Sequence, residues 1–563
     1  MQDDPRKIHA QIIKTHNTLE QHSLPLLNKL ITFYSNSRHF SDALSIFRQI
    51  PFPNVVSWTS LISGNPNSTH SLLHFVDMIR HSIRPNQRTL ASILKICGSI
   101  CCVSFGMQVH CLSIKLSMAS RVFCGCALVG FYSKCRVVDH ARKVFDEMPQ
   151  RDEVCYSSMV VGFAQNCRPV DALAVFGEMV SRNVGSTVYS VSGALTACAE
   201  LAALEQCRVV HGHGVVTGIS RAVYVSTGLV TAYGNCGMVN EARRVFDESL
   251  SEMNIVGWNA MMASYAHQGD KCSVLELFRL AESQGLVPDD YSFLAVLTSL
   301  YNAGLADETE KWINKMKVNY KLKPSLEHYT CLVGALGRVG KLDEAEKIAM
   351  AMPMKPDAGV WRVLLSASAA HGAPETAWRM SKRLLELNPS DDSAYVIAAN
   401  AFSASGRRNE ASEIRKKMNN LRVKKEGGRS WIEVHGEVHV FMAGDDKHEM
   451  IDLVYSKLAE LVEEISKLGY VPNWSEMIHD VEEGEKREGL SYHSEKLALA
   501  FGVLSGAAPP GKPLRILKNL RICRDCHEAF KYFSAVLEKE IIVRDVNRYH
   551  TFRNGSCTCG DYW

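Results

Sequence analysis

Residues 127–148 read ALVGFYSKCRVVDHARKVFDEM, and the pattern of this stretch decides the fold. Apolar side chains recur there at helical spacing, which places them on one face of a helix. The pattern breaks at Cys135 and resumes from Ala141 through Phe145. The stretch therefore predicts two short amphipathic helices joined by a tight turn.

The same helix pair recurs along the chain. The residue types at Leu128, Tyr132, Ala141 and Phe145 return in the same order at Leu30, Tyr34, Ala43 and Phe47, and again at Leu229, Tyr233, Ala242 and Phe246. Helix pairs that repeat in this way bury their apolar faces by stacking, so they form a solenoid with a continuous core and a concave face. We place the units at 24–54, 55–86, 87–121, 122–152, 153–187, 188–222, 223–254, 255–289, 290–325 and 326–357.

The ends and openings of these units are distinctive. Several units close with Met-Pro, as at Met148-Pro149, and two open with a Val-x-Trp pattern around Trp58 and Trp258. Periodicity alone would also fit a protein-binding solenoid of the tetratricopeptide type. The endings, the openings and the unit lengths of 31 to 36 residues resemble instead the PLS-type pentatricopeptide repeats of land plants.

The composition is that of a folded protein of several domains. A chain of 563 residues is too long for one compact core, and its net charge of +3 would require a polyanion to bind in a locally basic groove. Most of the 18 cysteines lie in apolar helical patterns, as at Cys97, Cys135, Cys198 and Cys236, so we expect buried free thiols in a reducing compartment. No apolar run reaches the ~20 residues of a membrane helix, and we expect no membrane span.

Four regions are expected. Residues 1–23 form a partial repeat, residues 24–357 the array of about ten repeats, residues 358–427 two degenerate repeats that resemble the E1 and E2 motifs of the family, and residues 428–563 a final domain. The first residues lack the Arg- and Ser-rich character of a transit peptide. Residues 6–11, RKIHAQ, resemble the middle of another such unit, so we expect the sequence to begin inside its array, which would also explain this difference.

The resemblance implies that the repeats bind single-stranded RNA, one base per unit. In this family the fifth and the last residue of a unit select the base. Their alternative role is helix capping, which Thr, Asn and Asp favour. The pairs are Asn28 with Asn54 for a pyrimidine, Thr59 with Asn86 and Thr227 with Asn254 for adenine, Asn259 with Asp289 for uridine, and Thr330 with Asp357 for guanine.

Two units depart from these standard pairs. Cys126 with Asp152, and Ser157 with Thr187, imply no base. The last full unit of such proteins is aligned four positions upstream of the edited cytidine. The resemblance thus predicts A at −12, A at −7, U at −6 and G at −4 relative to that cytidine.

The C-terminal region carries a metal-ligand pattern. His493-Ser494-Glu495 is followed by Cys523 and Cys526 in a Cys-x-x-Cys motif. One imidazole and two thiolates leave a fourth tetrahedral position of zinc open for water, as a catalytic site needs. Zinc deaminases pair His-x-Glu with Pro-Cys-x-x-Cys and use the Glu as a proton shuttle, and here Ile522 replaces the Pro. A purely structural zinc knuckle is the alternative, but it would not need Glu495.

A second group of N and S donors follows at His527, His550, Cys557 and Cys559, and the chain ends in Asp-Tyr-Trp. Together with residues 493–498 and 523–527, this ending resembles the DYW domain of pentatricopeptide proteins. The resemblance assigns these four residues to a structural zinc, which makes two zinc ions per chain. A single catalytic zinc with unligated terminal cysteines is the alternative.

The expected fold is thus an α-solenoid of stacked helix-turn-helix repeats followed by a C-terminal α/β cytidine-deaminase-like zinc domain. The resemblance implies C-to-U editing of an organellar transcript, with Glu495 as the catalytic residue. A non-catalytic RNA-binding factor for splicing, cleavage or stability, or an endonuclease, is the alternative. The expected partner is single-stranded organellar RNA, with accessory editing proteins and without DNA, in the mitochondrion or alternatively the chloroplast.

Overall fold

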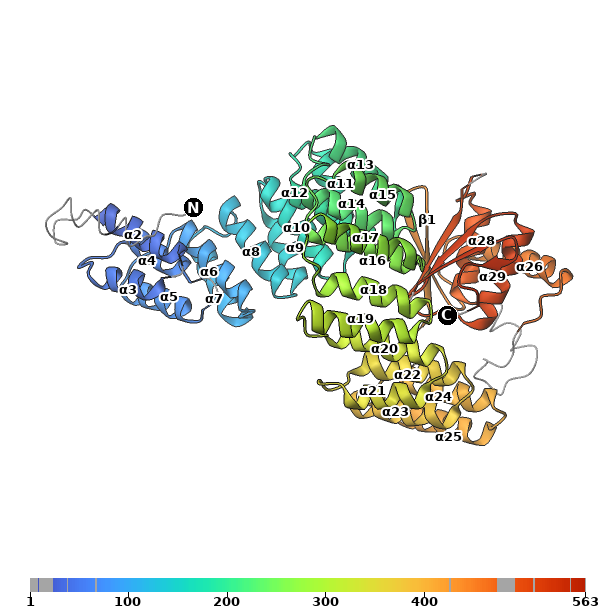
Figure 1. Cartoon of the computed structure of the whole chain (residues 1–563). Helices are drawn as coiled ribbons and strands as arrows, with labels where there is room; N and C mark the ends of the chain where they lie inside the picture. Colours follow the sequence, from blue (N-terminus) through green and yellow to red (C-terminus); the bar gives the residue numbers. More distant parts are fainter. Residues whose placement is uncertain are drawn as a thin grey trace. The chain divides into compact units, whose positions relative to one another are not determined.

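The computed structural model describes residues 9, 24–37, 39–65, 68–424, 427–472, 492–509, 512–546 and 548–561 (Figure 1). The expected partial repeat at 1–23 therefore lies outside the described residues, except for His9. Two compact units divide the chain, namely residues 1–198 with 213–225, and residues 199–212 with 226–563.

Paired antiparallel helices fill the chain from residue 24 to residue 420. The quoted stretch forms α8 (Val122–Lys134) and α9 (Val138–Glu147), and Arg136 in the turn between them has a left-handed φ of 60°. The other helices are α2 (Leu24–Asn36), α3 (Phe40–Arg48), α4 (Val55–Ser63), α5 (His70–Arg80), α6 (Gln87–Ser99), α7 (Val103–Lys115), α10 (Glu153–Gln165), α11 (Pro169–Ser181), α12 (Val188–Leu201), α13 (Leu204–Val216), α14 (Val223–Asn235), α15 (Val239–Glu248), α16 (Ile255–Gln268), α17 (Lys271–Ser283), α18 (Asp290–Asn302), α19 (Ala306–Asn319), α20 (Leu326–Arg338), α21 (Leu342–Ala351), α22 (Ala358–Ala370), α23 (Pro374–Leu387), α24 (Asp392–Ala404) and α25 (Arg408–Asn420).

The repeated apolar positions form the core of the solenoid. Leu128, Ala141 and Phe145 are fully buried, and α8 packs against both α6 and α10, the first helices of the neighbouring pairs. Stacking of first helix on first helix buries a face that a single pair would leave in water. The prediction of an α-solenoid is confirmed.

The cysteines depart in part from the expectation. Cys97, Cys198 and Cys236 are buried free thiols, but Cys135 is only half-buried. Cys126 and Cys155 form a disulfide, which the sequence did not predict. These two residues belong to consecutive units. The packing of α8 against α10 brings their side chains together.

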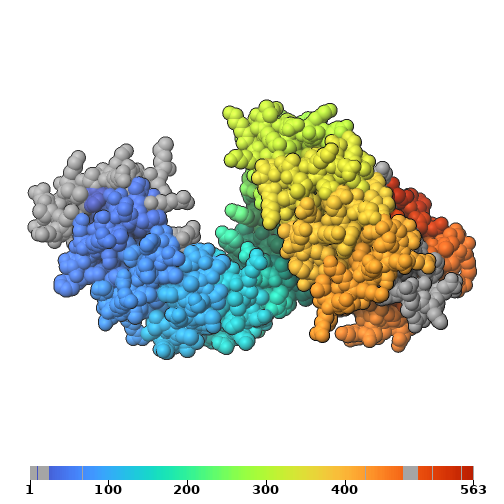
Figure 2. Space-filling model, turned by 90° about the horizontal axis from the view of Figure 1, so that it is seen from below, coloured from blue at the N-terminus to red at the C-terminus, as the bar shows by residue number. Residues whose placement is uncertain are grey.

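Stacking continues beyond residue 357. Trp361, Leu364 and Leu365 of α22 share a buried cluster with Leu332 and Val333 of α20. In the space-filling view of Figure 2 the helices coloured yellow to orange form one packed mass. The region expected as two degenerate repeats therefore has two further helix pairs, α22 with α23 and α24 with α25.

The C-terminal region is an α/β domain with a six-stranded sheet in the order β2-β1-β3-β4-β5-β6. Strands β3 and β4 are parallel and all other neighbours are antiparallel. Its elements are β1 (Arg429–Val434), β2 (Glu437–Met442), α26 (Ile451–Lys467), α28 (Ser494–Leu504), β3 (Leu514–Lys518), α29 (Arg524–Val536), β4 (Ile541–Arg544), β5 (Tyr549–Arg553) and β6 (Ser556–Cys557).

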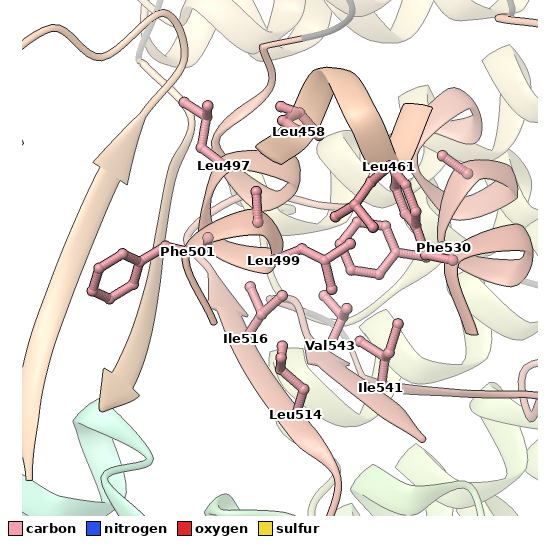
Figure 3. Close-up of a cluster of buried hydrophobic side chains, with 14 of the residues drawn as sticks. Leu458, Leu461, Leu497, Leu499, Phe501, Leu514, Ile516, Phe530, Ile541 and Val543 are labelled. Atoms are coloured by element: carbon pink, nitrogen blue, oxygen red, sulfur yellow. The ribbon is translucent and has the colours of Figure 1, made fainter. Parts of the chain in front are cut away.

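Buried side chains of helices and sheet form the core of this domain. Figure 3 shows Leu458 of α26, Leu499 of α28 and Phe530 of α29 gathered above Ile516 of β3 and Val543 of β4. Alternate residues of the two strands belong to this cluster, Leu514 and Ile516 in β3 and Ile541 and Val543 in β4, as the period of two of a β-strand requires. The packing of α28 and α29 on this core holds their first turns near each other.

Across the described ranges, no helix combines the length and apolarity needed to cross a membrane.

Candidate active site

The first turns of two helices bring the predicted catalytic residues together. His493 is the residue immediately before α28 and Glu495 lies in its first turn, whereas Cys523 immediately precedes α29 and Cys526 lies in its first turn. Donor atoms of all four side chains lie within 4.8 Å of one another. Residues separated by almost thirty positions in the sequence thus form one cluster.

The spacing of these donors fits a zinc ion. The Nδ1 atom of His493 lies 3.5 Å from Sγ of Cys523 and 3.3 Å from Sγ of Cys526. Tetrahedral zinc with usual bond lengths would hold an imidazole nitrogen and a thiolate sulfur about 3.6 Å apart. The neighbouring Cys526 thiol, followed by His493, lowers the pKa of Cys523, which favours the thiolate that a metal binds.

Glu495 is fully buried beside these donors. Its Oε2 atom accepts hydrogen bonds from the Lys518 ammonium and from the Ser494 hydroxyl, the latter at 3.2 Å. Among the described residues its Oε1 atom has no hydrogen-bond partner. Burial raises the pKa of this carboxyl, but Lys518 and His493 outweigh it and hold the pKa at about 2. Glu495 is therefore an ionised acceptor with one oxygen available inside the cluster.

A buried ion pair joins the two ligand-bearing turns. The Lys496 ammonium lies 2.7 Å from Oδ2 of Asp525, and the Tyr470 hydroxyl donates to Oδ1 of the same carboxylate at 2.7 Å. Lys496 follows Glu495, and Asp525 lies between the two cysteines, so the pair holds the first turn of α28 against that of α29. The sequence prediction missed this role, although both residues lie inside the motifs that it used.

The second predicted cluster also assembles. Donor atoms of His527, His550, Cys557 and Cys559 lie within 4.8 Å of one another. The Nε2 atom of His527 lies 3.1 Å from Sγ of Cys559, and the Nδ1 atom of His550 lies 3.8 Å from Sγ of Cys557. The Cys557 thiol, then the two imidazoles, hold the pKa of Cys559 at about 2. Four N and S donors form a closed set, which is the structural form of a zinc site.

Carboxylates orient the imidazoles of this second cluster. Asp545 Oδ2 lies 3.4 Å from Nε2 of His550, the nitrogen that faces away from the sulfurs. Carboxylates in this position fix the tautomer and direction of a metal-binding histidine. The same Oδ2 atom accepts the backbone N–H of Ile522 at 3.2 Å. A proline has no backbone N–H and could not donate this bond. Because Ile522 precedes Cys523, its bond to Asp545 links the two clusters.

In several units the last residue caps the first helix of the next unit. Its side-chain Oδ1 accepts backbone N–H groups of that helix, so the helix-capping role holds at this position. The capping residues that were predicted to bind RNA are Asn54, Asn86, Asn254, Asp289 and Asp357. Every one of these caps uses Oδ1 and does not use the other side-chain atom, Nδ2 or Oδ2.

The fifth residue of a unit lies next to the last residue in several units. Nδ2 of Asn259 donates to Oδ1 of Asp289 at 2.8 Å. The Thr59 hydroxyl is 2.7 Å from that of Thr89, which in turn donates to Asn86 at 3.0 Å. No such contact joins Asn28 with Asn54, Thr227 with Asn254 or Thr330 with Asp357 within the part of the chain that the structure describes.

The two non-standard units are also built differently. The disulfide to Cys155 removes the Cys126 thiol from the fifth position of its unit. Ser157 and Thr187 instead place their hydroxyl oxygens 2.7 Å apart. These units thus present no amide or carboxylate pair like that of Asn259 and Asp289.

Comparison with known proteins identifies each region. The DYW family of nucleic acid deaminases matches residues 469–563, and the E motif matches residues 371–433. The PPR repeat matches residues 126–152, 154–184, 224–252 and 327–355.

Similar proteins cover nearly the whole chain. A pentatricopeptide repeat-containing protein of Arabidopsis thaliana is 37% identical over 99% of this chain and 94% of its own length. Another protein of the same plant, named as mitochondrial, is 36% identical over 100% of this chain and 89% of its own length.

A solved structure supports the fold of the repeats. The pentatricopeptide repeat protein PPR10 from maize, in complex with an 18-nucleotide psaJ RNA element, has a TM-score of 0.58 and 19% identity, over 70% of this chain and 60% of that chain. At this identity the likeness shows the solenoid fold alone. On the strength of the full-length relatives, the chain belongs to the pentatricopeptide repeat family and carries an E motif and a DYW deaminase domain.

Proposed function

We propose that this protein edits RNA: the repeats bind a single-stranded organellar transcript in a sequence-specific way, and the DYW domain deaminates one cytidine to uridine with zinc. The observation that carries the proposal is the buried Glu495, whose Oε1 is unbonded beside an imidazole and two thiols at zinc spacing. A structural site has no use for an ionised carboxylate there.

The residues of the cluster have separate roles in this proposal. His493, Cys523 and Cys526 would hold a zinc ion, which when bound supplies a water whose pKa is lowered toward neutrality. Glu495 is ionised and takes a proton at Oε1. It takes this proton from the water that adds at C4 and gives it to N3. It then takes the proton of the new C4 hydroxyl and gives it to the exocyclic amino group, so that the C4–N4 bond breaks, ammonia leaves and uracil remains. Lys518 fixes the carboxylate through Oε2.

The second cluster would hold a structural zinc, which makes two ions per chain. His527, His550, Cys557 and Cys559 tie the start of α29 to β5 and to the residues after β6. The contact of Asp545 with both His550 and Ile522 would carry the effect of this zinc to the catalytic cluster. We also propose the division into repeats at 24–357, degenerate E repeats at 358–427 and the deaminase domain at 428–563.

The RNA partner is proposed from the repeats. The pairs that end in Asn86, Asn254, Asp289 and Asp357 would select A, A, U and G at −12, −7, −6 and −4. Asn28 with Asn54 would select a pyrimidine. We propose a mitochondrial location, with the chloroplast as alternative, since one relative is named as mitochondrial. Accessory editing proteins would act on the same complex.

The test is a product assay on purified full-length protein loaded with zinc. The substrate is an RNA oligonucleotide with the four predicted bases upstream of a single cytidine. Uridine formation at that cytidine supports the proposal. Strand scission would indicate an endonuclease instead, and tight binding without either product would indicate a non-catalytic RNA-binding factor.

A further inference from the structure

Contacts between the deaminase domain and the repeats lie inside the second compact unit, residues 199–212 with 226–563. The Glu433 carboxylate of β1 accepts the backbone N–H groups of Glu205 at 2.9 Å and Gln206 at 3.1 Å. These two amides lie in the first turn of α13 and have no acceptor within their own helix. The Trp431 indole donates to the Leu201 carbonyl at 3.1 Å on the same segment.

A second group of contacts involves the end of α14. The Tyr549 hydroxyl donates to the carbonyls of Asn235 and of Gly234, the latter at 3.2 Å. Arg515 of β3 donates to the Cys236 carbonyl at 3.1 Å, and Arg544 of β4 donates to the Asn235 carbonyl at 3.4 Å. Carbonyls at a helix C-terminus lack intrahelical partners and carry partial negative charge.

The charges of the two groups are therefore complementary to the helix ends that they contact. An anionic side chain lies at a helix N-terminus, and two guanidinium groups lie at a helix C-terminus. In addition, Tyr549 is buried, with 4% of its surface exposed. This arrangement satisfies helix-end groups with side chains from four strands of one sheet, which a chance contact would not do.

In α14, the contacts lie away from the residue that is predicted to bind RNA. Thr227 lies in the first turns of α14, whereas Asn235 ends that helix. Eight residues of helix separate them, which is about 12 Å. The contacts of the deaminase domain with α14 thus lie at the other end of this helix from Thr227.

We propose that residues 199–206 and 234–238 form a docking surface for the deaminase domain of the same chain. Docking holds the catalytic cluster at a fixed distance from the base-selecting residues and leaves those residues open to RNA. The consequence of docking, the choice of one cytidine, rests on the proposed function. The docking itself can be measured without any reaction.

Two variants test the two contact groups separately. Glu433→Lys reverses the charge at the start of α13, with Glu433→Gln as a milder change, and Arg515→Ala removes a donor at the end of α14. Matched controls are Glu437→Lys, an exposed carboxylate at the start of the neighbouring strand β2, and Arg553→Ala, an exposed residue at the end of β5. Zinc content and circular dichroism establish that each variant is folded.

The first readout is amide hydrogen exchange of the full chain without RNA. We expect exchange at residues 205–206 to speed up at least about tenfold in Glu433→Lys, less in Glu433→Gln, and not in the controls. Arg515→Ala should speed exchange at residues 234–238. Equal exchange in the variants and in the unsubstituted protein would overturn the docking surface.

The second readout is editing of the RNA described above, extended by cytidines on both sides of the target. The docking variants should bind this RNA within about twofold of the unsubstituted protein, edit the target about tenfold more slowly and spread uridine to neighbouring cytidines. Unchanged or faster editing, with the same single product, would overturn the positioning role. If the unsubstituted protein forms no uridine, the proposed function and the positioning role both fail, while the exchange result still decides the docking surface.

Discussion

At the level of single residues, the carboxylate of Glu495 lies between a buried cation and the candidate zinc donors. Lys518 binds one oxygen, and the other oxygen faces the cluster without a bond from the described residues. The position of this unbonded oxygen beside the donors suits the residue to shuttle a proton. The buried ion pair of Lys496 with Asp525 holds the first turn of α28 against that of α29.

Replacing this carboxylate should separate metal binding from catalysis. We expect Glu495→Ala to retain both zinc ions and RNA affinity, and to lower the rate of uridine formation by at least about a hundredfold, the usual contribution of a general acid–base. Elemental analysis, RNA binding and the product assay measure the three quantities. His493→Ala should lose the catalytic zinc as well. An active Glu495→Ala protein would rule out the assigned role.

The second cluster makes a stoichiometric prediction. Cys559→Ser removes a donor whose pKa is held at about 2 by its neighbours, so the variant should bind one zinc per chain instead of two. The editing rate of the variant should also fall. Without the second zinc, His550 would no longer be held against Asp545, the residue that accepts the backbone N–H of Ile522 beside the catalytic cluster. Two zinc ions in the variant would show that the terminal cysteines bind no metal.

Asp357 caps a helix and is also proposed to select a base, and one substitution can separate the two roles. Asp357→Asn retains a good helix cap at the start of α22, because Asn and Asp cap equally well. With Thr330 it would form the pair that the resemblance assigns to adenine. We expect thermal stability to be unchanged and the preferred base at −4 to change from G to A in binding assays. An unaltered preference would leave capping as the only role of Asp357.

At the level of elements, the start of α24 is stabilised by charge. Oδ1 of Asp391 accepts the backbone N–H of Ala394 at 3.3 Å, and its Oδ2 lies 2.6 Å from Nη2 of Arg362. Burial raises the pKa of Asp391, but the Ser393 hydroxyl and Arg362 outweigh it, so the pKa lies below its ordinary value. A carboxyl with a depressed folded pKa stabilises the protein above its unfolded pKa of about 4 and loses this effect as the pH falls further.

The depressed pKa of Asp391 predicts that its contribution to stability depends on pH. At pH 7 we expect Asp391→Asn to lower the free energy of unfolding by about 1 kcal/mol, since Arg362 is half-exposed and its charge is partly screened. The difference between the two proteins should shrink as the pH falls below about 4. Urea unfolding at several pH values measures it, and Glu413→Gln, an exposed carboxylate in α25, is the control. A difference independent of pH would mean that charge plays no part.

At the level of the whole molecule, base selection and deamination must be in register. If the catalytic cluster is held at a fixed distance from the last full unit, a cytidine moved by one nucleotide no longer meets Glu495. We expect such an RNA to bind with the same affinity and to be edited about a hundredfold more slowly, because misplacement of the reacting group has this order of cost. Equal editing at both spacings would show that the deaminase domain is free to search along the RNA.

The solenoid and the catalytic ligand motifs were predictable from the sequence patterns, whereas the second donor set came from the resemblance to the DYW domain. Helical periodicity around Tyr132 and the ligand types at His493 and Cys523 are properties of residues close together in the chain, and they sufficed for the fold class and for the chemical class of the site. The capping role of the Asn and Asp residues that end several units was predictable as well, because N-cap preference is local.

The partners of those residues were decided only by the tertiary structure. Lys518 meets Glu495, and Asp545 meets both His550 and Ile522, because parallel pairing of β3 with β4 aligns the ends of the two strands. The disulfide of Cys126 with Cys155 and the contact of Glu433 with α13 likewise join segments that no periodicity relates. Such contacts depend on how strands and helices pack over long sequence separations, whereas local patterns specify only which elements form.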